Sequence, residues 1–368
     1  MASPSSPRGN PVGQEELIHT ILTTQPVNLD ELHNFSRLVG GFLNNDVRRL
    51  VWPKFLAVSR YEKVDFRSLA QKPSTQLRCD LDRSFHSYDH TADWSEEHFA
   101  AKKNLLSDMI TALLVRNPGL EYYQGFNSVC TVILEVCQDD PALAYNIIEY
   151  LSQHFFKDFM GSNFEKVRLL LPLVLEIIRK VDKKLFVFLN EAKVESFFSL
   201  SWIITWFGHD IKDLDKVARI YDALICSHPS FIIYMAVAAV LQVREKIFSL
   251  PCEFSAVHKF LIGITEGEEE LQFDTIIGNA DRLISTLPPA RLKAYAEASL
   301  AEQIKRREVG LFLRPPCITR YTDTDTVQLE KYLEEQERLA ELKQNKHDEL
   351  VNGDLLFAVS SAIFGFFK

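Results

Sequence analysis

Two polar side chains, Arg83 and Gln124, stand out because of the residues around them. Arg83 ends the stretch LRCDLDR, in which Leu77, Asp80 and Arg83 recur at every third position. Gln124 lies in the stretch EYYQGF, between two tyrosines and Gly125. A guanidinium neutralises charge that develops on a phosphoryl group in transfer, and a carboxamide orients the attacking water. The two side chains together are suited to phosphoryl transfer to water.

Each motif alone also has a structural interpretation. Asp80 and Arg83 would lie on one side of a helix and form a surface ion pair, which contributes about 0.5 kcal/mol or less. The YYQG stretch would then be a turn into a helix, with Gln124 as a capping residue. The functional interpretation is that Asp80 orients Arg83 and holds its guanidinium outward.

Motifs of an independent enzyme are absent from the sequence. There is no GxxxxGK[ST] loop, so a nucleotide and its Mg²⁺ would have to come with a partner. GxSxG and HExxH are also missing, and His209-Asp210 has no identifiable serine or cysteine partner. We therefore expect no cofactor and no metal site in this chain.

The elements that must position these residues are helices. Between Leu105 and Leu114, apolar side chains recur with the period of one helix face, and Asn117-Pro118-Gly119 follows as a stop signal. Similar patterns cover residues 29–39, 45–58, 126–137, 141–156, 164–180, 194–207, 214–226, 231–247 and 289–307. Segments 194–207 and 231–241 are apolar on nearly all sides and should lie in the centre of the bundle. The sequence predicts an all-α, multi-helix protein.

Charge and cysteine content narrow the class of protein. The net charge is −9 over 368 residues, which argues against a nucleic-acid partner because a polyanion needs a basic surface. The six cysteines form no CxxC pair and no zinc-ligand cluster, and no signal peptide is seen. These features are typical of a protein in the reducing cytosol.

Composition divides the chain into segments. We expect a flexible tail, N-terminal helices, a main domain, further helices packed on that domain, a linker and a charged C-terminal helix. Their ranges are 1–14, 15–39, 40–250, 251–308, 309–326 and 327–349. Residues 355–367 then form a run of uncharged, mostly apolar residues. As a helix this run would be about 20 Å long, shorter than the ~30 Å hydrocarbon core of a bilayer. It predicts either a helix that folds back onto the domain or a tail directed to a membrane.

Three motifs in this order resemble the signature of the TBC domain, the fold of Rab GTPase-activating proteins. They are Arg48-x-x-x-Trp52, Asp80-x-x-Arg83 and Tyr122-x-Gln124-Gly125. The resemblance covers roughly residues 40–250, where the later stretches SLSWIITWFGHDI and VARIYDALICSHPSF also look like helices of that family. Leu77 stands where the family usually has isoleucine, a change that conserves volume.

The resemblance implies a mechanism in which this chain activates a partner Rab GTPase and catalyses no reaction alone. Arg83 would serve as an arginine finger and Gln124 as a glutamine finger. The ring of Tyr122 would support the turn around Gln124, and Gly125, without a side chain, would admit the partner's backbone.

For Arg48 and Trp52 the resemblance implies a supporting role. They would hold the fold together and frame the site from behind, and the Arg219–Asp222 stretch would be structural as well.

The resemblance is strongest to one subgroup of the family, whose members are anchored by their tails. It implies a location on the cytosolic side of the endoplasmic reticulum membrane and a role in ER-to-Golgi vesicle transport. In that subgroup the anchor is a full transmembrane helix, whereas residues 355–367 are shorter, so membrane association rests on this tail. The alternative is a non-catalytic helical adaptor that binds a small GTPase or another protein.

Overall fold

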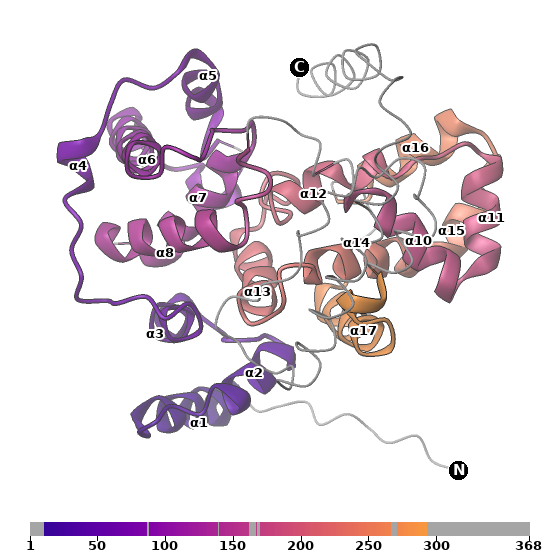
Figure 1. Cartoon of the computed structure of the whole chain (residues 1–368), viewed down its shortest axis with the longest axis horizontal. Helices are drawn as coiled ribbons and strands as arrows, with labels where there is room; N and C mark the ends of the chain where they lie inside the picture. Colours follow the sequence, from indigo (N-terminus) through magenta and orange to yellow (C-terminus); the bar gives the residue numbers. More distant parts are fainter. Residues whose placement is uncertain are drawn as a thin grey trace, which may run out of the picture. The chain divides into compact units, whose positions relative to one another are not determined.

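All regular secondary structure in the described part of the computed structural model is helical, as the sequence predicts (Figure 1). The structure describes residues 11–86, 88–138, 140–161, 167, 170–265 and 271–292. The N-terminal helices are α1 (Pro11–Thr23), α2 (Leu29–Arg37), α3 (Asn45–Phe55), α4 (Phe66–Leu69), α5 (Thr75–Arg83) and α6 (Glu96–Arg116), with a 3₁₀ turn η1 (Asp89–Thr91).

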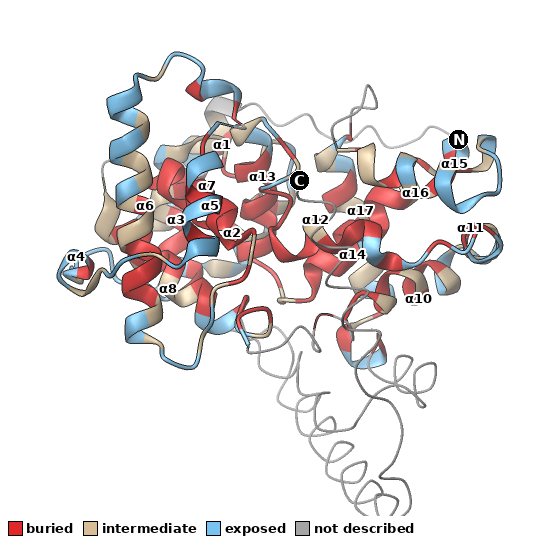
Figure 2. Ribbon diagram, turned by 90° about the horizontal axis from the view of Figure 1, so that it is seen from above, coloured by how far each residue is buried: buried red, intermediate tan, exposed pale blue. Residues whose placement is uncertain are grey.

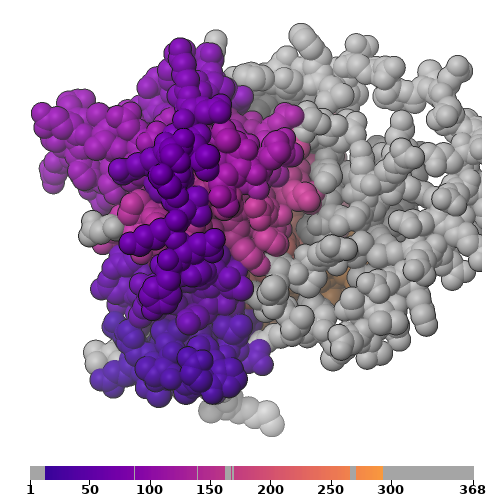
Figure 3. Space-filling model, turned by 60° about the vertical axis from the view of Figure 1, so that its left-hand side comes forward, coloured from indigo at the N-terminus to yellow at the C-terminus, as the bar shows by residue number. Residues whose placement is uncertain are grey.

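Capping residues mark the starts of four N-terminal helices. Four polar side chains accept hydrogen bonds from backbone N–H groups in the first turns of α2, α3, α5 and α6, namely Asn28, Asn44, Ser74 and Ser95. Each satisfies donors that the helix itself leaves without a partner. On the face shown in Figure 3, the N-terminal residues, indigo to purple, lie beside the magenta residues that follow them.

The helices after the site are α7 (Phe126–Cys137), α8 (Pro141–His154), α10 (Pro172–Val181), α11 (Lys183–Glu191), α12 (Leu200–Ile204), α13 (Leu214–Ile225), α14 (Phe231–Gln242), α15 (Arg244–Ser249), α16 (Phe254–Gly263) and α17 (Phe273–Thr286), with a 3₁₀ turn η2 (Ser196–Ser199). Helix α7 is buried along its whole length and packs against α3, α5, α6, α8 and α13. Figure 2 shows this buried interior in red, with blue exposed segments on α5 and α6.

The prediction of one continuous helix over 194–207 is wrong. The structure has the short elements η2 and α12, and the chain then turns at Trp206 and Phe207, whose φ angles are 51° and 63°. The Trp206 ring packs edge-on against Phe155 and Tyr221, at centroid distances of 5.3 and 5.2 Å. These ring contacts favour the turn over a continued helix. They involve residues distant in the sequence, so the periodicity of apolar residues cannot predict them.

Two further boundaries differ from the sequence prediction. The helical pattern at 231–247 divides at Val243 into α14 and α15. At the N-terminus, α1 already begins at Pro11, inside the predicted flexible tail 1–14. The Gln14 side chain is buried there and donates to the Gly41 carbonyl at 2.7 Å, which ties this end of α1 to the domain.

Several predictions fall outside the described residues. They concern most of the predicted helix 289–307, the linker 309–326, the charged helix 327–349 and the apolar tail 355–367. Of the predicted C-terminal helices 251–308, the described residues contain α16 and α17, and α17 packs on α14 and α13. Within the described part of the chain, no helix combines the length and the apolar character needed to cross a bilayer.

Candidate functional site

Helix α5 places Arg83 at its last position. The Ser74 hydroxyl caps its start by accepting from the Leu77 backbone N–H at 3.2 Å, and Leu77 and Asp80 are buried against α6 and α7. The backbone becomes extended at Ser84, which ends the helix. The Arg83 side chain remains 42% exposed whereas that of Asp80 is 2% exposed, so one face of α5 buries the acid and leaves the base at the surface.

The Asp80 carboxylate joins the two sequence motifs. One oxygen, Oδ1, accepts a hydrogen bond from Nη2 of Arg83. The other, Oδ2, accepts from the Tyr122 hydroxyl at 2.6 Å. A buried carboxylate is stable only when its oxygens have such partners. Asp80 therefore binds the Arg83 guanidinium of one motif and the Tyr122 hydroxyl of the other at the same time.

The Tyr122 hydroxyl is held in its protonated form. Burial, and after it the neighbouring Asp80 carboxylate, raise the pKa of Tyr122 well above its ordinary value. The hydroxyl therefore stays a hydrogen-bond donor at neutral pH. A deprotonated tyrosine would instead place a negative charge beside the Asp80 carboxylate and repel it.

Gln124 lies at the turn between Tyr122 and helix α7. Its neighbour Tyr123 is buried, and the Tyr123 hydroxyl donates to the Ile204 carbonyl at 2.7 Å. Gln124 itself is half-buried. Among the residues that the structure describes, the Gln124 carboxamide has no hydrogen-bond partner within the chain. Its donor and acceptor groups are therefore available to a bound molecule.

Gly125 is required at this turn by the chain itself. It is the N-cap of α7 with φ of +99°, a conformation that residues with a side chain rarely adopt. A Cβ at this position would lie 2.9 Å from Cγ2 of Thr205, which is too close. The family resemblance implies that Gly125 leaves space for the backbone of a partner. In the structure, Thr205 of the same chain occupies the space beside it.

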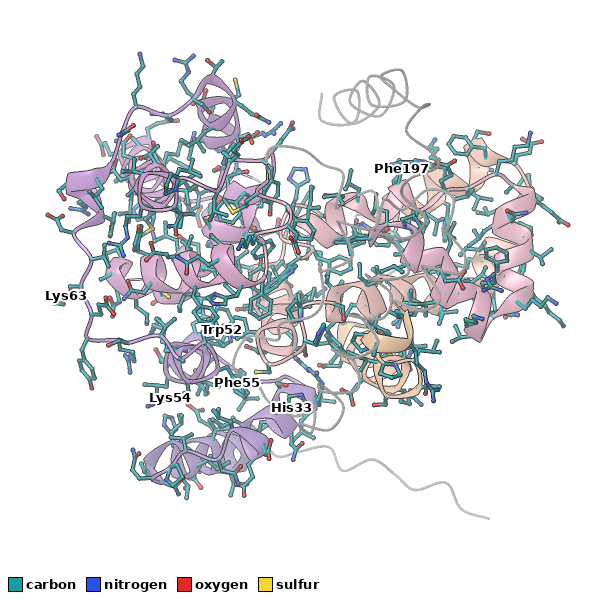
Figure 4. The ribbon with its side chains drawn as sticks, viewed as in Figure 1. His33, Trp52, Lys54, Phe55, Lys63 and Phe197 are labelled. Atoms are coloured by element: carbon teal, nitrogen blue, oxygen red, sulfur yellow. The ribbon has the colours of Figure 1, made fainter. Side chains whose placement is uncertain are left out.

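Arg48 and Trp52 contact a different carboxylate, that of Asp222. Nε of Arg48 lies 3.1 Å from Asp222 Oδ1, and Nε1 of Trp52 donates to the same oxygen at 2.9 Å. The Phe42 backbone N–H donates to Oδ2 at 3.1 Å. Asp222 is fully buried, and Figure 4 shows Trp52 between α3 and α13. These residues fasten α3 to α13 and do not contact Asp80 or Gln124.

A chain of contacts nevertheless connects Trp52 with the Gln124 turn. The Trp52 ring packs on Tyr221, with centroids 6.2 Å apart. The Tyr221 hydroxyl donates to the Thr205 carbonyl at 3.2 Å, and the Thr205 methyl group lies beside Gly125. Trp52 thus supports from the core the residue against which the turn is packed.

Two polar residues of the site were missed by the sequence interpretation, Ser84 and Asn127. Nδ2 of Asn127 donates to Oγ of Ser84 at 2.9 Å, and Asn127 Oδ1 lies 3.2 Å from the Tyr122 hydroxyl. A signal was present in the sequence, since Asn127 is a carboxamide in the first turn of a mostly apolar helix pattern. Such a residue must find partners when it is buried.

The described side chains offer no metal site. Within the ranges that the structure describes, no group of three or more His, Cys, Asp or Glu side chains is arranged to hold a metal ion. The groups that the site presents are a cationic fork, held by Asp80, and the half-buried carboxamide of Gln124, two residues after the Tyr122 that also binds Asp80.

Comparison with known proteins gives these features a context. The model of the Rab-GTPase-TBC domain family matches residues 45–248. TBC1 domain family member 20 of Homo sapiens is 32% identical over 299 residues, which cover 80% of this chain and 72% of that protein. GTPase-activating protein gyp10 of Schizosaccharomyces pombe is 27% identical over 269 residues, covering 71% and 70% of the two chains.

A solved structure shows the same fold at low sequence identity. The flagellar RabGAP TBC domain of Chlamydomonas superimposes with a TM-score of 0.59 and 14% identity, covering 73% of this chain and 91% of that one. The helical architecture described above is thus shared with TBC domains.

Proposed function

The chain belongs to the Rab-GTPase-TBC domain family, and from this premise we propose that it accelerates GTP hydrolysis on a Rab GTPase. Arg83 enters the nucleotide site of the partner and neutralises the charge that develops on the transferred phosphoryl group. Gln124 orients the attacking water. GTP and Mg²⁺ belong to the partner, so this chain completes another protein's active site and needs no cofactor of its own.

The observation that carries the proposal is the shared Asp80 carboxylate. It holds a partly exposed arginine on one oxygen and, through Tyr122, the turn with Gln124 on the other. An ion pair that served only to stabilise a helix surface would not need a buried acid or a bond to a second segment of the chain. Two groups that must act on one phosphoryl group do need a fixed relation to each other.

Single-turnover GTP hydrolysis on a panel of GTP-loaded Rab proteins tests the proposal. Removing an arginine finger lowers the rate by about 10³- to 10⁵-fold, or roughly 4–7 kcal/mol. We expect Arg83→Ala to cause a loss of this size, and Gln124→Ala to abolish most of the activation as well. Arg83→Lys should also be poor because the ammonium lacks the planar fork.

Arg78→Ala is the matched control, because Arg78 is an exposed arginine on the same helix. It should leave the rate unchanged. The proposal fails if the folded Arg83 and Gln124 variants stay within a few-fold of wild type. Binding of GTP-loaded Rab without any acceleration by the wild-type chain would instead support the adaptor function.

We further propose that the protein acts on the cytosolic side of the endoplasmic reticulum membrane, in ER-to-Golgi traffic. The support is the uncharged apolar sequence of residues 355–367 after a strongly charged segment. Cell fractionation of the full chain and of a chain truncated after Leu350 tests this. The full chain should sediment with membranes, and equal solubility of the two chains would contradict the proposal.

A further inference from the structure

Asn127 is the polar residue through which both parts of the site are connected. It lies in the first turn of α7, is 5% exposed, and is flanked by buried residues on every side of that helix. A buried carboxamide without partners costs free energy, so the direction of its hydrogen bonds determines what it can hold in place.

On one side, Asn127 holds the end of helix α5. Its Nδ2 donates to Oγ of Ser84 at 2.9 Å and lies 3.4 Å from the Asp80 carbonyl oxygen. The Ser84 hydroxyl in turn donates to that same carbonyl at 2.9 Å. Ser84 directly follows Arg83, so these bonds fix the backbone on which the guanidinium is mounted.

On the other side, Asn127 holds the segment with the glutamine. Its Oδ1 lies 3.2 Å from the hydroxyl of Tyr122, two residues before Gln124, and accepts the weaker branch of a shared hydrogen bond whose main acceptor is Asp80 Oδ2 at 2.6 Å. The backbone closes the same turn, since the Ser128 N–H donates to the Gly125 carbonyl at 3.0 Å. Asn127 therefore lies in the first turn of α7, directly after the turn that contains Gln124, while its side chain reaches the α5 end.

We propose that Asn127 is a positioning residue, which sets the distance and orientation between Arg83 and Gln124 for attack on the partner's GTP. This inference rests on the proposed function. Asn127 touches neither the nucleotide nor the water, and it acts through Ser84, Asp80 and Tyr122. Its loss lets the two fingers move independently, so it lowers the rate of the chemical step more than the affinity for the GTPase.

The test is single-turnover hydrolysis at increasing concentrations of this protein, which separates the maximal rate from the half-saturating concentration. Asn127→Ala removes both sets of hydrogen bonds. Asn127→Asp keeps the shape but replaces the donor with an oxygen that faces the Asp80 carbonyl. Small misplacements of catalytic groups cost up to about 100-fold in rate. We expect both variants to lower the maximal rate by about 10- to 100-fold, with a nearly unchanged half-saturating concentration.

Thr131→Val is the matched control. Thr131 lies one turn further along α7, is also buried, and has a hydroxyl with no hydrogen-bond partner among the described residues. Its variant should match wild type in maximal rate, in half-saturating concentration and in thermal unfolding. If only the Asn127 variants have a low maximal rate, and their fold is stable, the effect of Asn127 is on positioning and not on packing.

Three results would overturn the inference. One is a wild-type maximal rate in both Asn127 variants. Another is a fall in rate that comes together with weaker GTPase binding and lower melting temperature, and the third is loss of cooperative unfolding in both variants. If Arg83→Ala still abolishes activation, each of these results would show that Asn127 has only a structural role. If wild type activates no Rab, or Arg83→Ala is fully active, the proposed function itself fails.

Discussion

The Tyr122 hydroxyl donates to Asp80 Oδ2 at 2.6 Å and so joins two segments that are 42 residues apart in the sequence. This bond links the arginine motif directly to the glutamine motif. It depends on a protonated tyrosine, and the raised pKa of Tyr122 keeps its hydroxyl a donor. The link between the two motifs therefore includes this buried contact as well as the hydrogen bonds of Asn127.

Tyr122→Phe tests this contact. The substitution keeps the ring but leaves a buried carboxylate oxygen of Asp80 without its donor, which costs about 1–3 kcal/mol of folding free energy. We expect GTP hydrolysis on the Rab to slow by about tenfold or more because the Asp80 carboxylate, which holds Arg83, loses its link to the Gln124 turn. Urea unfolding and single-turnover hydrolysis measure the two effects. Tyr234→Phe removes another buried tyrosine hydroxyl bond, to the Leu287 carbonyl, and should reduce stability alone.

Gly125→Ala should disturb the glutamine turn. Alanine at φ of +99° is strained by about 1–2 kcal/mol, and its Cβ would meet the Thr205 methyl group at 2.9 Å. We expect reduced stability in thermal unfolding and a large loss of activation. The double variant with Thr205→Ser removes that methyl group but leaves the backbone strain. It should recover part of the loss, and full recovery would mean that steric contact alone requires this glycine.

Asp222→Ala should destabilise the fold strongly. Arg48 would then be a buried guanidinium without its carboxylate, which costs about 3–5 kcal/mol when one partner of a buried pair is removed. The Trp52 N–H would lose its acceptor as well. The free energy of unfolding, measured with urea, checks the loss.

An exposed ion pair on α3, the helix that carries Arg48, supplies the comparison for the Asp222 variant. Asp46 pairs with Arg49, and its side chain is 78% exposed. Asp46→Ala should therefore cost at most about 1 kcal/mol. Equal losses in the Asp46 and Asp222 variants would contradict the assignment of Asp222 as the main link between α3 and α13.

Cysteine labelling should follow burial. Burial raises the pKa of the Cys137 thiol to about 12 and raises those of Cys130 and Cys226 well above their ordinary values. The reactive thiolate is therefore scarce at pH 8 in these three, whereas Cys79 and Cys252 are exposed. Among the five cysteines that the structure describes, we expect a maleimide to modify Cys79 and Cys252 and to spare the other three, as mass spectrometry of peptides would show.

Labelling of Cys79 also reports on the proposed partner face. Cys79 lies one helical turn before Arg83 on α5, so a bulky adduct there stands beside the arginine. We expect such an adduct to slow the stimulated GTP hydrolysis on the Rab by about tenfold, or about 1.4 kcal/mol. An adduct on Cys252, in a chain with Cys79→Ser, should leave the rate unchanged. Equal rates for both adducts would argue against approach of the GTPase from this side of α5.

The sequence predicted local features of the fold well and long-range contacts poorly. The all-α class and the helix over 126–137 follow from side-chain periodicity, which is a property of neighbouring residues. The break near Trp206 does not, because ring contacts with Phe155 and Tyr221 cause it. Tertiary packing overrides helix propensity at such positions.

The same division holds for the site. Asp80 and Arg83 lie within one turn, so their pairing could be predicted from spacing. The partners of Arg48 and Asn127 could not, because Asp222 is 174 residues from Arg48 and the Ser84–Asn127 bond spans 43 residues. Pattern and spacing identify which side chains carry chemistry. Only the folded chain shows which buried groups hold them.

Helix α7 begins at the site and is buried from Phe126 to Cys137. A segment of this kind opens to solvent only when most of the domain unfolds, so its amide protons should exchange with deuterium as slowly as any in the molecule. The glutamine turn is mounted on one of the most persistent parts of the protein. Mild heat or denaturant should therefore not melt this end of the site ahead of the domain, and loss of activation should coincide with global unfolding.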